Sequence, residues 1–520
     1  MLGVGRGGPS CACYSTGGGL MFGIGTIRRA LGLGSVVATA SSIARRSWLG
    51  SRIAGKYDAA QNSKENAKHW ANADRLSANA AHSPAVRAAL RSRSRYECQN
   101  NSYLAGLVQT MANDLVGTGP RLQLRIPGNP EASTLLSRRF AKWAKSIGLA
   151  DKLRVMHESR VRDGECFAVF ANNPQLDRFD VQLDLRPVES DQVTSAGPLV
   201  DPLEVDGIVH DEFGNVVRYT LLNHHPGSNL AMPWSFIDVP SARVVHWFRP
   251  SRPGQARGVP ELTAALPLCA QLRRYTLATL TSAETAAMLA GIMKTNLPPG
   301  DGQPVSIAAM DEIELVRGAL LTLPAGWDTA QFKAEQPTGT FREFKNEILN
   351  EMARCVSVPF NVMAGNSSGY NYSSGRLDHL VYYRVVWIER GRMEQRVLDR
   401  LFSAWLYEAM LIPGYLPANL PPFVDWETTW QWDGVESIDP QKDAQATQLE
   451  MSLGLTTLAE EAAARGRDWR EVLNQLAIEQ AEAKRLGVDW INAAAALSGP
   501  PSPPDAQPTQ QAGVTPNAAA

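Results

Sequence analysis

Apolar residues recur every three or four positions along much of the 520-residue chain, which is the spacing of amphipathic helices. The first such segment opens with Ser83 and Pro84, an N-cap followed by proline, and we expect one helix from there to Gly117. Glycine and proline separate the later helical segments. These cover residues 131–147, 151–161, 261–294, 340–356, 376–410, 441–453 and 457–487.

Between residues 165 and 247 the pattern changes to one typical of strands. The turn residues 211–215 stand between two short apolar runs, which predicts a β-hairpin. A tryptophan-rich stretch over 426–432 predicts a further strand, and residues 305–337 predict short ones. We therefore expect an α+β fold in which helices and strands occupy separate segments.

The segment 364–375 has an unusual composition, with three glycines, four serines and no charged residue. Such a segment neither buries itself nor forms a regular element alone, so we expect a loop. The periodic run over 376–410 that follows would form a helix about 50 Å long, with Gly391 as a candidate bend.

The composition is that of an ordinary globular protein, and 520 residues are too many for one compact core. The formal net charge of −1 excludes a global basic field that would draw the chain onto nucleic acid, so any DNA contact must be local or weak. The six cysteines lack the spacing of a disulfide framework, and we expect reduced thiols. The sequence contains no run of about 18 apolar residues, so it predicts no membrane-spanning helix.

Arginines crowd the first turns of the helix that begins at Pro84. For this group a solvated or subunit-facing surface is favoured over a DNA site. The group consists of Arg87, Arg91, Arg93 and Arg95.

Candidate catalytic motifs are few. Residues 365–369 match G-x-S-x-G around Ser367, but this nucleophile elbow needs a strand before the serine and a helix directly after it, and neither is predicted here. Nothing in the sequence suggests an activated thiol at Cys166. The pair His224–His225 is better explained as solvated than as a metal site, and Asp163–Glu165 as a helix end before a strand. No phosphate-binding G-x-x-x-x-G-K-[ST] motif occurs.

Several short motifs follow one another in a specific order and spacing over about residues 55–435. They are Tyr57–Ala60 with Trp70, Arg91–Arg93 with Asn100–Asn101 and Gly117–Gly119, His157–Arg160 with Asp163–Glu165, Val244–Trp247 with Gly258–Pro260, Pro359–Phe360, and Asn371–Arg376. In this order and spacing the motifs resemble those of the lambda family of tailed-phage portal proteins.

The resemblance implies a portal fold with a helical wing and stem, a β-rich clip, a long kinked helix and a helical crown. By position, it implies the following parts: a disordered arm (1–55), wing (56–150), first stem helix (151–163), clip (164–256), second stem helix (257–294), wing (295–438) with a tunnel loop (364–375) and the long helix (376–410), crown (439–495), and a disordered tail (496–520).

The implied function is a twelve-fold ring at one capsid vertex, which forms the channel for DNA packaging and ejection. The implied partners are further copies of the chain, the large terminase subunit, head–tail connector proteins, the major capsid protein or scaffold, and double-stranded DNA without sequence preference. The protein would occur in the virion and, during assembly, in the host cytoplasm. No catalysis, cofactor, metal or membrane contact is expected.

A channel through which DNA slides should not hold many phosphates with fixed cations. The expected channel residues are the uncharged loop side chains and the nearest cation, namely Asn366, Ser367, Ser368, Tyr370, Asn371, Tyr372, Ser373 and Arg376. Four basic residues of the implied stem either contact DNA or, as we favour, pair across subunits: Arg154, Arg160, Arg273 and Arg274. Two alternatives stay open, an enzyme of unknown class using Ser367 or Cys166, and a monomeric adaptor or tail component.

Overall fold

The computed structural model describes residues 64, 67–176, 179–197, 201–229, 233–288, 292–295, 327–330, 340–435 and 440–487. The chain divides into two compact units, Met1–Arg75 and Leu76–Ala520, and all elements below belong to the second. The predicted arm (1–55), the predicted tail (496–520) and most of the strand segment predicted over 305–337 lie outside the described residues.

Two helices replace the single helix that was predicted after Ser83. A short helix α3 (Ala78–Ala81) precedes α4 (Pro84–Asn100) and α5 (Ser102–Val116). The break falls at Asn101, whose backbone is extended and whose side-chain oxygen accepts a hydrogen bond from the Tyr103 amide at 3.1 Å. An asparagine that caps the following helix in this way competes with continuation of the preceding one.

Helices α6 (Pro130–Ser146) and α7 (Leu149–Asp163) confirm the predicted helices over 131–147 and 151–161. Helix α7 ends at Gly164, which has a positive φ of 94°. A Cβ atom built on Gly164 would lie 2.2 Å from the carbonyl carbon of Val259, so this crossing of two backbones requires glycine.

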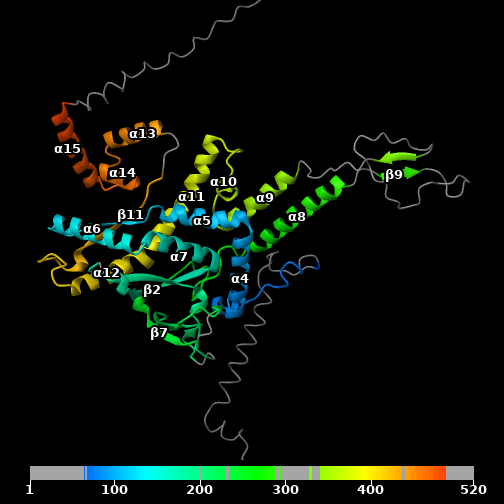
Figure 1. Ribbon diagram of the computed structural model, residues 1–520, viewed down its shortest axis with the longest axis horizontal. Helices are drawn as coiled ribbons and strands as arrows, with labels where there is room; N and C mark the ends of the chain where they lie inside the picture. Colours follow the sequence, from blue (N-terminus) through cyan, green and yellow to red (C-terminus); the bar gives the residue numbers. More distant parts are fainter. Residues whose placement is uncertain are drawn as a thin grey trace, which may run out of the picture. The chain divides into compact units, whose positions relative to one another are not determined.

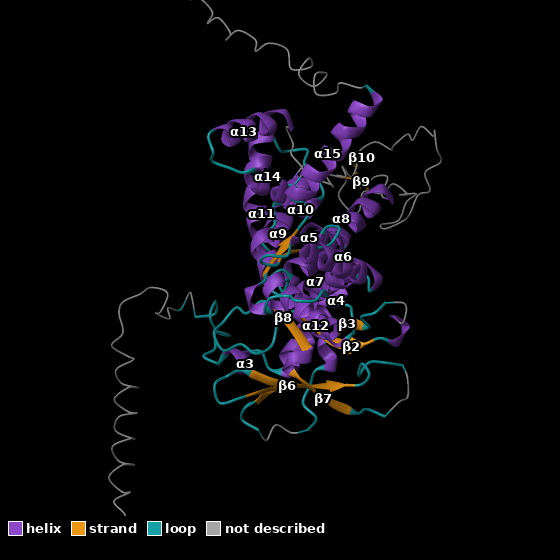
Figure 2. Ribbon diagram, turned by 90° about the vertical axis from the view of Figure 1, so that its left-hand side faces the viewer, coloured by secondary structure: helices purple, strands orange, loops and turns teal. Residues whose placement is uncertain are grey.

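The predicted β segment forms two antiparallel sheets (Figure 2). The first has the order β3–β2–β8, with β2 (Glu165–Asn172) between β3 (Leu183–Val188) and β8 (Val244–Phe248). The second has the order β4–β5–β6–β7. Its strands are β4 (Glu204–Val205), β5 (Ile208–His210), β6 (Val216–Leu222) and β7 (Phe236–Pro240). The hairpin predicted around 211–215 is confirmed by the pairing of β5 with β6.

Strand β2 is buried on both faces and thereby joins the two sheets to the rest of the protein. One face contributes Cys166, Ala168 and Phe170 to the main hydrophobic core, which also contains residues of α5, α6 and α7. The other face contributes Phe167 and Val169 to a smaller core shared with the second sheet. The central strand of the predicted clip (164–256) thus lies in a core that it shares with helices α5 and α6 of the predicted wing.

Helices α8 (Leu266–Met288) and α9 (Thr340–Cys355) lie side by side (Figure 1). Tyr275 of α8 packs against Phe341 and Phe344 of α9, with ring centroids 5.6 and 4.8 Å apart. Beyond the end of α8, strand β9 (Ile292–Thr295) pairs antiparallel with β10 (Trp327–Ala330). The helix predicted over 261–294 is thus shorter than expected, since residues 292–295 form a strand.

The predicted long helix begins earlier than expected and contains one π-helical turn. A short helix α10 (Phe360–Ala364) is followed by residues 365–371 and then by α11 (Tyr372–Met393). One π-helical turn, Glu394–Leu398, connects α11 to α12 (Asp399–Leu411). The irregularity was predicted at Gly391, but it lies in this wider turn three residues later.

Strand β1 (Arg121–Arg125) pairs antiparallel with β11 (Glu427–Gln431), which confirms the predicted tryptophan-rich strand. The segment after Asp439 confirms the predicted helical pair with breaks near its glycines. It consists of α13 (Pro440–Ser452), α14 (Leu458–Ala464) and α15 (Trp469–Leu486). Within the described ranges, residues 174–176, 190–192, 241–243 and 423–425 form short 3-10 turns, and 394–398 is the π turn.

Candidate channel segment and buried ion-pair network

The predicted channel loop is exposed and is ordered by its own polar groups. It follows Gly365, which ends α10 in the left-handed conformation with φ of 61°. The Asn366 side chain accepts a hydrogen bond from the Ser368 amide at 2.9 Å, and Asn361 Nδ2 donates to Ser367 Oγ at 3.4 Å. Asn366, Ser367 and Ser368 are all exposed. Short polar side chains therefore shape this loop without any hydrophobic anchor of their own.

The last part of the predicted loop is helical. Asn371 caps α11, because its side chain accepts from the Ser374 amide at 2.8 Å while Ser374 Oγ accepts from the Asn371 amide at 3.2 Å. This reciprocal capping box places Tyr372 and Ser373 in the first turn of the helix. The loop proper is thus residues 365–371, shorter than the predicted 364–375.

Two larger side chains belong to the predicted channel segment, Tyr370 within the loop and Arg376 in helix α11. Tyr370 is half-buried, and burial together with the nearby Asp378 carboxylate raises the pKa of its phenol. Arg376 is half exposed, and its guanidinium lies 3.7 Å from the Asp443 carboxylate of α13. The cation closest to the loop is therefore already engaged by a carboxylate of the same chain.

The four predicted stem arginines have different surroundings. Arg154 bonds to the Gly117 carbonyl at 2.7 Å and to the Asp151 carboxylate, and Arg273 makes two hydrogen bonds to Glu97 at 2.9 and 3.1 Å. Arg160 is 1% exposed and forms ion pairs with two carboxylates of its own chain, so its guanidinium offers no surface to DNA or to a neighbouring subunit. Arg274 is exposed and has no ion pair or hydrogen bond with any residue that the structure describes.

A buried ionic network centred on Glu165 connects α4, β2 and the segment before α8. Arg257 donates to both oxygens of Glu165 at 2.7 to 3.1 Å and to Asp206 Oδ2 at 3.1 Å. Arg87 of α4 pairs with Asp206 as well. Glu165 also accepts from the Gly258 amide at 2.8 Å. With this many donors, a fully buried carboxylate is satisfied.

Two arginines of α4 extend the network, which makes part of the surface prediction for this helix wrong. Arg87 is 2% exposed and Arg91 is 8% exposed, so neither lies on a solvated face. Arg91 reaches Ser190 Oγ and Asp191 Oδ1, each at 2.9 Å. Arg95 binds Asp163, the residue at the predicted helix end, at 2.8 Å.

The neighbours of Glu165 hold its carboxylate in the ionised form. Burial alone would raise the pKa of Glu165, but Arg257 and His246 outweigh it and hold that pKa well below its usual range. Burial has the opposite effect on the pKa of His246, which is lowered although Glu165 acts to raise it. Sequence reasoning missed Arg257 and Asp206 entirely. It singled out Glu165 as the residue after a helix end and as part of a family motif, but not as an ion-pair partner, because no local feature of the sequence indicates a partner that is 92 positions away.

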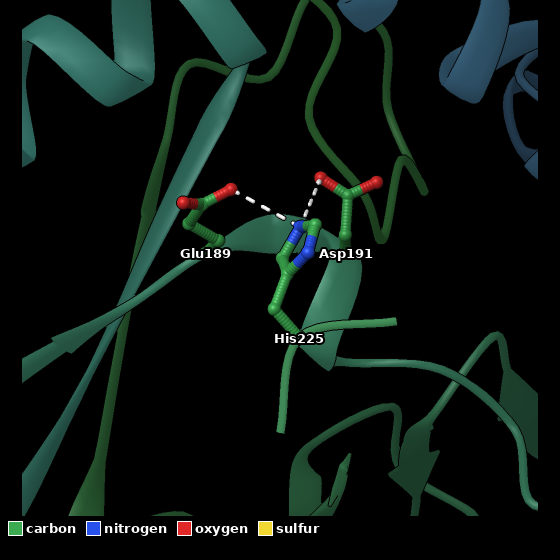
Figure 3. Close-up of side chains that lie close together, drawn as sticks. All are labelled: Glu189, Asp191 and His225. Atoms are coloured by element: carbon green, nitrogen blue, oxygen red, sulfur yellow. Dashed lines mark ion pairs between the residues drawn. The ribbon is translucent and has the colours of Figure 1, made fainter. Parts of the chain in front are cut away.

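Three side chains with metal-ligating atoms come together near the end of the first sheet (Figure 3). His225 Nε2 lies 3.3 Å from Glu189 and 3.7 Å from Asp191, so this histidine is not simply solvated as predicted. Arg95 lies 3.2 Å from Glu189 and 2.8 Å from Asp191. Since a guanidinium already occupies both carboxylates, the arrangement is better explained as an ion-pair cluster than as a cation site.

Neither candidate nucleophile has the surroundings that catalysis requires. Ser367 follows helix α10 rather than a strand, which is not the geometry of a nucleophile elbow. Cys166 is 2% exposed, and burial raises the pKa of its thiol strongly, so the reactive thiolate is disfavoured. Cys98, Cys166, Cys269 and Cys355 are free thiols. Among the described helices, none combines the length and apolar character needed to cross a lipid bilayer.

The family model and the similar proteins agree on one protein family. The family model described as "Phage portal protein, lambda family" matches residues 64–390. The "Probable portal protein" of Halomonas phage phiHAP-1 is 24% identical over 433 residues, which is 77% of this chain and 81% of that protein. The "Portal protein" of Escherichia phage N15 is 23% identical over 452 residues, covering 76% and 85%. "Portal protein B" of Escherichia phage lambda is 22% identical over 321 residues, covering 55% and 60%.

Among solved structures, the chain is similar to one in the neck of an empty GTA particle, with 15% identity and a TM-score of 0.44 over 71% of this chain and 90% of that one. A chain in the virion of the native gene transfer agent particle has 17% identity and a TM-score of 0.41, over 72% and 92%.

Proposed function

The chain belongs to the lambda family of phage portal proteins, and we propose from this membership that twelve copies close into a ring at one capsid vertex. The ring is the channel for DNA packaging and ejection. It docks the large terminase subunit during packaging and the head–tail connector afterwards, and it contacts the major capsid protein or scaffold. The observation that carries this proposal is the family match over residues 64–390, which is more than half of the chain.

We place loop 365–371 at the wall of the channel. Its exposed side chains are amides and hydroxyls, which contact a phosphate backbone without the counterion release that makes cationic contacts strong. Arg376 is held by Asp443, which reduces its attraction for DNA. Weak contacts that do not depend on base sequence allow a duplex to move in both directions.

For the stem we propose helices α8 and α9 in place of residues 151–163 and 257–294. Two features support this change: α8 and α9 pack side by side, and the strand pair β9–β10 lies in the segment that connects them. Residues 289–339 then take the role of the clip, and the segment 164–256 becomes part of the wing, with which it shares its core. Helices α13–α15 keep their proposed role as the crown.

We propose a structural rather than catalytic role. The buried Cys166 thiol and the helix-preceded Ser367 give no support to the alternative of an enzyme. The free energy for pumping DNA then comes from another protein, the terminase that docks to the ring.

Negative-stain electron microscopy and native mass spectrometry of the purified protein test the proposal. We expect rings with a central hole and a mass of about twelve subunits of 56.6 kDa. A protein that stays monomeric under capsid-assembly conditions would contradict it and favour the adaptor alternative. Labelling of Ser367 by a serine-reactive probe would favour the enzyme.

A further inference from the structure

One face of α11 carries large apolar side chains that no described part of the chain covers. They are spaced three, four or seven residues apart and therefore lie on one side of the helix as a single stripe. Each is between 52% and 64% exposed. This α11 stripe consists of Leu377, Leu380, Val381, Trp387 and Ile388. The opposite face, with Tyr382 and Val386, lies in the main core. An exposed row of large apolar side chains of this kind marks a surface for a partner.

A single charged residue interrupts the α11 stripe. Arg384 lies one helical turn from Val381 and from Ile388, so it belongs to the same face. Arg384 is exposed, and within the described part of the chain it has neither an ion pair nor a hydrogen bond. A partner surface for the stripe should therefore offer apolar contact together with negative charge.

Helix α9 carries such a surface. Glu343, Glu347 and Glu351 are spaced four residues apart, are exposed, and form no ion pair or hydrogen bond with the residues that the structure describes. Like charges at this spacing destabilise an isolated helix, so a cationic partner would relieve their repulsion. Phe344 lies beside these glutamates and is 49% exposed, which adds apolar area to the α9 surface.

We propose that the α11 stripe docks on the α9 surface of a second copy of this chain, with Arg384 facing Glu347. The inference rests on the proposed ring and names the residues that close it. A ring needs two different, complementary faces on each subunit, and one chain here carries both halves of such a pair. Neither Arg384 nor Glu347 forms an ion pair with a residue that the structure describes, which leaves both available to a neighbour.

Charge reversal tests this pairing in the full-length protein. We expect Arg384→Glu and Glu347→Arg each to lower the ring fraction at least about tenfold at fixed concentration, because like charges then meet at every contact around the ring. The double variant, which restores opposite charges in reversed order, should recover ring formation. Arg138→Glu, an exposed reversal on α6, is the matched control and should leave the rings intact.

The possible results distinguish a failure of this residue pairing from a failure of the proposed ring function. Rings that persist in Arg384→Glu would overturn this pairing while leaving the proposed function intact, and a single-variant defect without rescue in the double variant would do the same. A wild-type protein without rings would contradict the proposed function itself. A second readout is crosslinking of the Arg384→Cys and Glu347→Cys double variant with a short bismaleimide, because an arginine–glutamate pair can hold its Cα atoms farther apart than a disulfide spans. A ladder of covalent multimers, absent from each single variant, is expected, and a chain that stays uncrosslinked would also overturn the pairing.

Discussion

Arg160 of α7 and Glu389 of α11 form a buried ion pair although 229 positions separate them in the chain. The Nε atom of Arg160 also lies 3.1 Å from Glu261 Oε1, on the segment that leads into α8. Burial acts to raise the pKa of Glu389, but the Arg160 guanidinium outweighs it, so that pKa is lowered. One guanidinium thus joins α7, the long helix and the approach to α8.

Replacing this arginine should therefore be costly. Arg160→Met removes the buried counter-charge of Glu389 and Glu261, whose other cationic partners, Arg392 and Arg249, are about half exposed. We expect a loss of about 3–5 kcal/mol in the free energy of unfolding. Urea unfolding measures the loss. The control is Arg154→Met on the same helix, whose partner Asp151 is 85% exposed and whose loss should stay below about 1 kcal/mol. Equal losses in the two variants would show that the buried ion pair contributes no more to the free energy of unfolding than the exposed one.

The buried histidine of α7 predicts a pH dependence of stability. Burial, and then the Arg160 charge, hold the pKa of His157 well below its ordinary value of 6.5. As the pH falls below 6.5 the unfolded chain binds a proton that the folded chain does not, so stability is present above this pH and decreases below it. Each such proton contributes a slope of up to about 1.4 kcal/mol per pH unit.

The variant His157→Gln should flatten the dependence of unfolding free energy on pH between about 6.5 and 5. Met156→Leu, which changes a buried neighbour without removing a titrating group, should keep the original slope. An unchanged slope in His157→Gln would mean that this histidine is not held neutral by the fold.

Substitution by alanine should have opposite effects on stability at two glycines, Gly164 at the backbone crossing and Gly106 in helix α5. Gly164→Ala combines a φ of 94° with a Cβ atom 2.2 Å from the Val259 backbone, and we expect a loss of at least about 2 kcal/mol in unfolding free energy. Gly106→Ala, within helix α5, meets nothing within 4 Å and should instead stabilise by about 0.5–1 kcal/mol. Thermal unfolding of both variants provides the comparison, and a tolerated Gly164→Ala would refute the close approach.

The channel loop should matter for DNA but not for assembly. Replacing Asn366–Tyr370 by a glycine–serine sequence of equal length keeps the capping residues Asn371 and Ser374, so α11 retains its first turn. We expect normal rings and reduced retention of packaged DNA, measured as nuclease-protected genome per particle. The control Asn371→Ala should instead destabilise the helix start by about 1 kcal/mol. Capsids that hold DNA normally after the loop replacement would show that this loop is not the channel contact.

Interactions between residues that are close in sequence were sufficient to predict many of the helices and strands. The helix ends at Gly117 and Gly164, the hairpin at 211–215 and the strand at 427–431 depend on residues close to one another in sequence, and all are confirmed. The errors are also instructive, because Asn101 and Asn371 act as helix caps through their side chains. Apolar spacing predicted a continuous helix at the first position, and composition predicted a loop at the second.

Whether a polar residue is buried was decided only by the tertiary structure. Arg87, Arg91 and Arg93 lie on the same helix in the same kind of sequence, yet the first two are buried and the third is exposed. Their carboxylate partners, Asp206 and Asp191, are 119 and 100 positions away. Periodicity in the sequence indicates which side of a helix is apolar. A charged side chain, however, is buried only where an oppositely charged residue lies next to it in the folded protein, and this depends on contacts between distant segments.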